Sequence, residues 1–182
     1  MYRSKVAQVD SELSEFVALL QHEGVGSFLE IGSQYGGSLW RIANALPKGA
    51  RIVSIDLPWG DGATRPHLEA AIAALNGQGY RAEAIFGDST DPGIIAHVQA
   101  LGPFDAIFID GNHTLPIVTR DWENFGPLSR IVAFHDIAWD RAVRPGRLPI
   151  EVSQLWRSIR GGYRHEEFVA PGSDKGIGVL WR

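Results

Sequence analysis

The stretch that decides the fold is residues 28–37, FLEIGSQYGG. A short apolar run over residues 27–31, in which Glu30 is the one acid, is followed by a turn at Gly32. A helical pattern begins at Gly37. A buried strand that stops at glycine and leads into a helix is typical of α/β proteins. Glycine suits such a turn because it lets a ligand approach the main chain. We therefore expect a binding site at the carboxyl end of this first strand.

The same pattern repeats along the rest of the chain. Further strands are expected at residues 51–56, 81–86, 104–110 and 130–135, and helices at 37–46, 67–76, from 92 onward, 115–124 and 150–159. Strands that alternate with helices indicate a parallel sheet with right-handed crossovers. Two strands in succession, at 163–169 and 175–182, predict a C-terminal antiparallel hairpin. The expected fold class is α/β: a Rossmann-like, doubly wound, mostly parallel seven-stranded sheet with helices on both faces.

Length and composition indicate one globular domain. A chain of 182 residues can bury a core without disulfides, and 45% hydrophobic with 21% charged residues is ordinary for a globular protein. Apolar residues at three- and four-residue steps predict an amphipathic helix over residues 5–22. We expect a single domain over 1–182, with this N-terminal helix within 1–24 and the core over 25–182.

Composition also argues against several kinds of partner and site. A net charge of −4 argues against nucleic acid or an anionic membrane as the partner. The absence of cysteine excludes disulfides, thiolate metal sites and a cysteine nucleophile. The first residues do not resemble a secretion signal and no apolar run is long enough to span a membrane, so the expected location is cytoplasmic.

Acidic residues mark the ends of the expected strands. Each lies in the strand or just beyond its carboxyl end, and they are Glu30, Asp56, Asp88, Asp110 and Asp136. Any one of them is an ordinary turn or cap residue. Because the carboxyl ends of parallel strands meet at one edge of the sheet, five acids in register indicate a shared site there.

The first two acids restrict the ligand. The dinucleotide fingerprint G-x-G-x-x-G needs a second glycine to admit a pyrophosphate, and aligned on Gly32 that position is Gln34. The carboxylate of Glu30 repels a pyrophosphate and suits an ammonium group. Asp56, 24 residues beyond Gly32, stands where a carboxylate can accept the hydroxyls of an adenosine ribose. Asp88 closes the third strand, where it could read an adenine amino group.

Five motifs carry a resemblance over most of the chain, from about residue 25 on. FLEIGSQYGGS, VSIDLP, FGDS, FDAIFIDGNH and GPLSRIVAFHD resemble, in this order, the successive motifs of class I SAM-dependent methyltransferases. The last two are most similar to the small-molecule O-methyltransferase branch, which includes catechol-type, macrocin-type and cephalosporin-hydroxylase-like proteins. The resemblance implies an S-adenosylmethionine cofactor, with Glu30 facing its amino group through the turn at Gly32, Asp56 on the ribose and Asp88 near the adenine. The other cofactor-binding residues that it implies are Ser33, Tyr35, Gly36, Leu57, Ser89 and Asp110.

A metal and a general base are further candidates near the fourth and fifth strands. Relatives of this branch often hold a divalent cation at the two positions occupied here by Asp110 and Asp136, and an oxygen pair suits Mg²⁺. His113 and His135 are additional candidate ligands. Ile137 stands where relatives carry a further ligand, so a site with metal and one without it both remain open. His113, with Asp110, is the catalytic candidate, because an imidazole titrates near neutrality; the alternative is a loop histidine that only hydrogen-bonds.

The acceptor pocket is expected in the loops 57–62 and 137–149, the second of which carries Trp139, Arg141, Arg144 and Arg147. A single helix before the first strand would leave this pocket open, or covered by a second subunit of a homo-oligomer. The predicted function is methyl transfer to a hydroxyl of a small metabolite such as a sugar, polyketide or phenol. The alternatives are a non-catalytic SAM-binding module and an NAD-dependent oxidoreductase.

Overall fold

A computed structural model describes residues 6–58, 62–141, 146 and 148–182. The elements follow the order α1 (Asp10–His22), β1 (Ser27–Ile31), α2 (Gly37–Ala43), β2 (Arg51–Asp56), α3 (Arg65–Gly77), β3 (Arg81–Phe86), α4 (Pro92–Leu101), β4 (Phe104–Ile109), α5 (Leu115–Phe125), β5 (Ser129–His135), α6 (Val152–Ile159), β6 (Arg164–Phe168) and β7 (Ile177–Trp181). Every expected strand and helix is present, and most of their bounds agree within a few residues.

The strands form one sheet in the order β3-β2-β1-β4-β5-β7-β6. The first five run parallel, whereas β7 is antiparallel to both β5 and β6. This confirms the predicted fold class, including the C-terminal antiparallel hairpin. The order reverses between β1 and β4, and ligands of doubly wound sheets bind beside the carboxyl ends of the strands at such a point.

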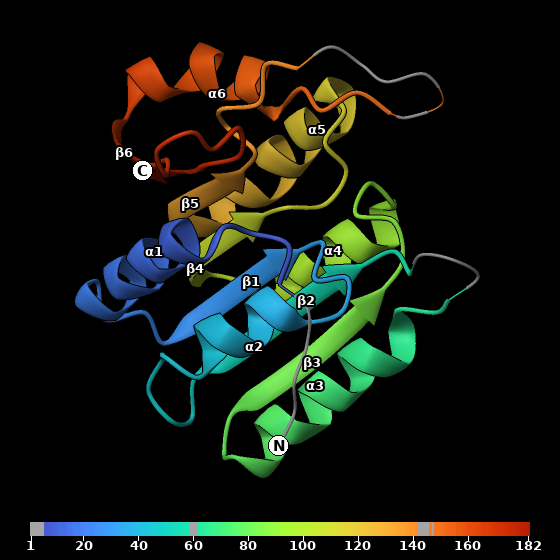
Figure 1. The fold of residues 1–182 in the computed structure, drawn as a ribbon. Coiled ribbons are helices and arrows are strands. Elements are labelled where there is room, and N and C mark those ends of the chain that lie inside the picture. The colour runs from blue at the N-terminus through green and yellow to red at the C-terminus, as the bar shows by residue number, and fades with distance from the viewer. Residues whose placement is uncertain (1–5, 59–61, 142–145, 147) are drawn as a thin grey trace.

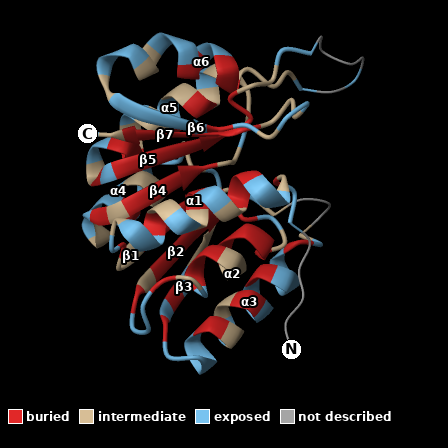
Figure 2. Cartoon of the chain, turned by 60° about the vertical axis from the view of Figure 1, so that its left-hand side comes forward, coloured by how far each residue is buried: buried red, intermediate tan, exposed pale blue. Residues whose placement is uncertain are grey.

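Helices cover both faces of the sheet, as Figure 1 shows. α1, α2 and α3 pack on one face against the side chains of Phe28, Ile52 and Phe108. α4, α5 and α6 pack on the other, in a cluster that includes Leu29 and Ile107. Neighbouring strand residues thus belong to opposite cores, which explains why the central strands β1, β4 and β5 are largely apolar rather than alternating. Figure 2 shows the result: central strands buried between helices whose outer faces are exposed, with the edge strand β6 exposed.

The N-terminal helix is shorter than predicted. It begins at Asp10 rather than at residue 5, and Val9 before it is extended, with φ −69° and ψ 133°. Two distant contacts hold this extended segment: the Gln8 amide donates to the carboxylate of Asp110, and the Lys175 ammonium donates to the carbonyl of Ala7. These tertiary contacts outweigh the helical period of the sequence. The rest of the predicted first turn lies outside the described residues.

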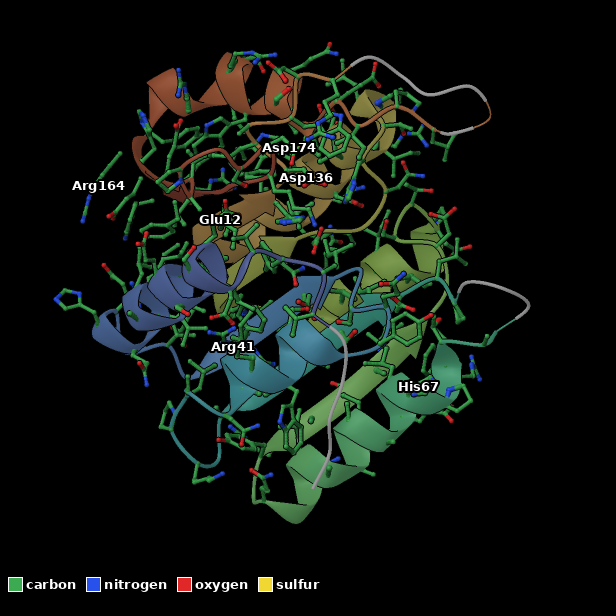
Figure 3. All side chains as sticks on the ribbon, viewed as in Figure 1. Glu12, Arg41, His67, Asp136, Arg164 and Asp174 are labelled. Atoms are coloured by element: carbon green, nitrogen blue, oxygen red, sulfur yellow. The ribbon has the colours of Figure 1, made fainter. Side chains whose placement is uncertain are left out.

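A buried acid joins α1 to the last hairpin. Glu12 is 1% exposed, and its two carboxylate oxygens accept the backbone N–H groups of Ala170, at 3.0 Å, and Gly176, at 3.1 Å. Both amides belong to the connection between β6 and β7, beside which Figure 3 places Glu12. Together with the contact between Lys175 and Ala7, these bonds hold the start of α1 and the segment before it beside the β6–β7 connection. Within the described ranges, no helix is long and apolar enough to cross a membrane.

Packing of α6 on the sheet depends on a glycine of β7. A Cβ at Gly178 would lie 2.6 Å from the indole ring of Trp156, which is 1% exposed. Gly178→Ala should therefore lower the free energy of unfolding by about 1–3 kcal/mol through overpacking. Gly77→Ala is the matched control, because Gly77 ends α3 with open space around it. Urea denaturation followed by tryptophan fluorescence compares the two; equal stabilities would contradict the packing argument.

Candidate active site

The site is built around the turn between β1 and α2. Gly32 has a φ of +90°, and a Cβ there would lie 2.3 Å from the carbonyl oxygen of Asp110 and 2.5 Å from Cα of Gly111. Only glycine fits this approach of the turn to the end of β4. The Gly32 N–H donates to Ile55 at 2.8 Å, so the ends of β1, β2 and β4 meet here.

Glu30 lies under this turn and is fully buried. One carboxylate oxygen accepts a hydrogen bond from the Ser33 hydroxyl, which in turn accepts one from Ser54 at 2.7 Å. The other, Oε1, is buried without a hydrogen-bond partner among the residues described. Burial raises the pKa of Glu30 to about 8, despite the Ser33 hydrogen bond, and the charges of Asp110 and Asp56 add to the rise. A cation beside Oε1 would favour the ionised form of this carboxyl and so lower its pKa.

Asp56, at the end of β2, also keeps one oxygen free. Its Oδ1 accepts the backbone N–H of Gln34 at 2.7 Å, while Oδ2 is buried and lacks a partner in the part of the chain that is described. Burial raises the pKa of this carboxyl. Gln34, which breaks the dinucleotide fingerprint, has a left-handed φ of 49°. Strained non-glycine residues of this kind concentrate at functional sites.

The acid at the end of β3 is more exposed than those at the ends of β1 and β2. Asp88 is exposed and uses Oδ1 locally, accepting the N–H of Thr90 at 2.8 Å and its hydroxyl at 2.7 Å. These hydrogen bonds lower its pKa. Behind it, Asp121 of α5 is fully buried. Burial raises the pKa of Asp121 to about 7, the charge of Asp88 adds to the rise, and both carboxylate oxygens lack a hydrogen-bond partner among the described residues.

Two acids and two histidines converge beyond β4 and β5. The ring of His113 lies between the acids, with Nε2 hydrogen-bonded to Asp110 at 3.2 Å and Nδ1 3.2 Å from Asp136. Nδ1 of His135 is 3.0 Å from Asp110 and 3.4 Å from Asp136. Asp136, which Figure 3 labels, has a left-handed φ of 60°. The structure therefore brings together all four residues that the sequence suggested for catalysis and metal binding.

The charges of this cluster are coupled. Burial would raise the pKa of Asp110, but the neighbouring histidines outweigh it and hold that pKa well below its usual range. Burial lowers the pKa of His113 and of His135, yet the carboxylates raise both pKa values overall. The pKa of Asp136 is raised by burial. Asp110 is thus the permanent anion of the group.

The donor set fits a cation. Ligand atoms of Asp110, His113 and His135 lie within 4.8 Å of one another. Nε2 of His135 and Oε1 of Gln8 are buried without hydrogen-bond partners among the described residues, while Nδ1 of His135 faces the carboxylates of Asp110 and Asp136. Buried polar atoms without partners are rare in folded proteins, so such atoms can bind a ligand.

The remaining predicted residues lie around this edge. Ser33 hydrogen-bonds to Glu30, Gly36 adopts a φ of 75° before α2, and Tyr35 packs edge-on against His67, with ring centroids 5.3 Å apart. Leu57 is 60% exposed beside Asp56. In the expected acceptor loops, Arg141 pairs with Asp174. Trp59, Arg144 and Arg147 lie outside the described residues.

Sequence reasoning missed three polar residues: Gln8, Glu12 and Asp121. Glu12 and Asp121 are acids on the buried stripes of their helices; Asp121 falls between Val118 and Phe125 at helical spacing. An acid inside such a stripe is a signal that could have been used. Gln8 offered no signal, because its hydrogen-bond partner among the described residues is 102 residues away.

Comparison with known proteins agrees with this geometry. A family model described as a methyltransferase domain matches residues 29–137. A search of curated proteins gives no match. Among solved structures, the fold is similar to an O-methyltransferase from Bacillus cereus in complex with SAH, with a TM-score of 0.72, 18% identity and coverage of 96% of this chain and 82% of that one. It is also similar to the O-methyltransferase TomG from Streptomyces achromogenes, involved in tomaymycin synthesis and solved with SAM.

For TomG the TM-score is 0.72, with 20% identity and coverage of 96% of this chain and 81% of that one. At these identities the structural likeness concerns the fold. The matched family model, however, spans β1 to the segment after β5, which holds Glu30, Asp56, Asp110 and Asp136. More than half of the chain lies within that match, and the expectation of a methyltransferase is confirmed. The chain belongs to the methyltransferase-domain family.

Proposed function

We propose that this protein transfers a methyl group from S-adenosylmethionine to a hydroxyl of a small metabolite such as a sugar, polyketide or phenol. The observation that carries the proposal is the buried Glu30, whose Oε1 has no partner among the described residues and lies under a glycine turn. A buried carboxyl in this state suits an ammonium group. Complexes of SAH and SAM with proteins of the same fold support this reading.

Different residues of the chain bind different parts of the cofactor. Glu30 pairs with the amino group, and the free Oδ2 of Asp56 accepts the ribose hydroxyls. Ser89 and Asp88 flank the adenine, while Ser33, Tyr35, Gly36 and Leu57 line the path between. When bound, S-adenosylmethionine supplies a sulfonium methyl group that a nucleophilic oxygen can take. Much of the rate then comes from alignment of that oxygen.

Asp110, His113 and Asp136 act on the acceptor. The acceptor oxygen bonds to the methyl carbon, the carbon–sulfur bond breaks with its electron pair left on sulfur, and the hydroxyl proton passes to the protein. The acceptor hydroxyl takes the place of the Asp136 carboxylate beside Nδ1 of His113, and this nitrogen accepts the proton, while Asp110, 3.2 Å from Nε2, stabilises the protonated form.

Ligand atoms of Asp110 and His135 lie within reach of one cation, and Asp136, 3.4 Å from Nδ1 of His135, would add a second carboxylate for a divalent cation such as Mg²⁺. When bound there, a divalent cation supplies positive charge that lowers the pKa of the hydroxyl. The acidic net charge of −4 favours a small-molecule acceptor over a nucleic acid.

Binding of S-adenosylmethionine should release a proton between pH 6 and 7. Free Glu30 has a pKa of about 8 and is protonated in this range, whereas the ammonium favours its ionised form. Affinity should therefore rise up to about tenfold from pH 6 to pH 7. Calorimetry in buffers of different ionisation heat measures both quantities. Glu30→Gln should abolish the proton release, and Glu69→Gln on exposed α3 should not; binding of NAD in place of S-adenosylmethionine would contradict the proposal.

His113→Gln should lower kcat by about 10²–10⁴-fold, because the variant loses the proton acceptor, and should leave the affinity for S-adenosylmethionine unchanged. The assay measures S-adenosylhomocysteine released with a panel of catechols, phenols and sugars. His22→Gln, at the exposed end of α1, is the control. Binding of the cofactor without turnover of any acceptor would favour a non-catalytic SAM-binding module.

A further inference from the structure

Gln8 reaches the acceptor side of the site from the opposite end of the sequence. It belongs to the extended residues 6–9 before α1, is 9% exposed, and donates through Nε2 to Oδ2 of Asp110. Its carbonyl oxygen, Oε1, is buried and has no hydrogen-bond partner in the described ranges. A side chain that is nine-tenths buried, aimed at a catalytic carboxylate and only half satisfied calls for a physical reason.

The segment that carries Gln8 is fixed on both sides. The Lys175 ammonium donates to the carbonyl of Ala7, and the Lys175 carbonyl accepts the N–H of Ala138 at 2.8 Å. Glu12 ties the first turn of α1 to Gly176. The chain on either side of Gln8 is therefore held in place by hydrogen bonds other than the one from Gln8 to Asp110.

The two ends of a glutamine amide have opposite chemistry. Nε2 is a donor that suits a free carboxylate, whereas Oε1 is a neutral oxygen of the kind that Mg²⁺ and Mn²⁺ bind beside carboxylates. A half-turn of the terminal amide exchanges these atoms without moving the chain. The side chain can thus face Asp110 favourably both with and without a cation.

The site has a use for such an oxygen. Asp110 and Asp136 supply the charged oxygens, but Ile137, which follows them, is a buried apolar residue and supplies no ligand. Nε2 of His135 is buried without a hydrogen-bond partner in the described ranges, and Nδ1 of the same ring lies 3.0 Å from Asp110.

Resting on the metal-assisted form of the proposed function, we propose that Gln8 supplies the amide oxygen that completes a divalent-cation site on Asp110 and Asp136. Cation binding then fastens residues 6–9 over the acceptor site. The N-terminal segment becomes part of the catalytic centre, and the acceptor side is closed by the chain itself.

The test titrates Mn²⁺ into the full chain and follows binding by electron paramagnetic resonance. Gln8→Leu, which keeps the volume and removes both polar atoms, should weaken Mn²⁺ binding by about 10- to 100-fold and leave the affinity for S-adenosylmethionine unchanged. Gln8→Glu, which keeps an oxygen, should bind Mn²⁺ at least as tightly as the wild type. Gln21→Leu, on the exposed part of α1, is the matched control and should change nothing.

Hydrogen exchange of residues 6–9 gives a second measurement. Mn²⁺ should slow exchange there in the wild type and in Gln8→Glu, and should not do so in Gln8→Leu. Equal Mn²⁺ affinities for Gln8→Leu and wild type would overturn the assignment of Gln8 while leaving metal assistance intact. Failure of the wild type to bind Mn²⁺, with S-adenosylmethionine still bound, would overturn the metal-assisted step and this assignment together, and leave the methyl-transfer proposal standing.

Discussion

The contact between Gly32 and the backbone of Asp110 and Gly111 is the constraint on which the rest of the site depends. A Cβ at position 32 would lie 2.3 Å from the Asp110 carbonyl oxygen, so any other residue would force β1 and β4 apart at their carboxyl ends. These are the strands at which the order of the sheet reverses. The absence of a side chain at position 32 thus sets the distance between Glu30 and Asp56 on one side of the turn and Asp110 and Asp136 on the other.

This convergence concentrates negative charge where burial makes charge costly. The chain limits this cost in three ways. The Ser33 hydroxyl donates a hydrogen bond to Glu30, a backbone N–H donates one to Asp56, and two histidines stabilise the charge of Asp110. None of these completes the coordination of the site, since Glu30, Asp56 and Asp136 each keep one buried oxygen unpartnered within the described residues. Ligands that supply the missing partners bind the folded state alone and therefore stabilise it.

Much of this could be predicted from the sequence, because it depends on local rules. Apolar runs without alternation, glycine at 32 and acids at the strand ends are properties of short segments, and parallel topology brings the acids to one edge. Those acids surround the site, although Asp88 turned out to be exposed and engaged with Thr90. The start of α1 was predicted wrongly, because Gln8 and Ala7 form hydrogen bonds with residues more than 100 positions away. No pattern within a window of sequence contains such contacts.

The bond between Glu12 and the β6–β7 connection has a consequence for how the molecule is made. The backbone N–H groups that donate hydrogen bonds to Glu12 lie 158 and 164 residues later in the chain. The ribosome synthesises α1 long before Ala170 and Gly176. The carboxylate of Glu12 therefore has neither of these hydrogen-bond donors during most of synthesis. β7, which must insert between β5 and the hairpin partner β6, is also among the last strands to emerge. The five parallel strands can therefore assemble on the nascent chain, whereas the antiparallel side of the sheet is completed only after translation of β7.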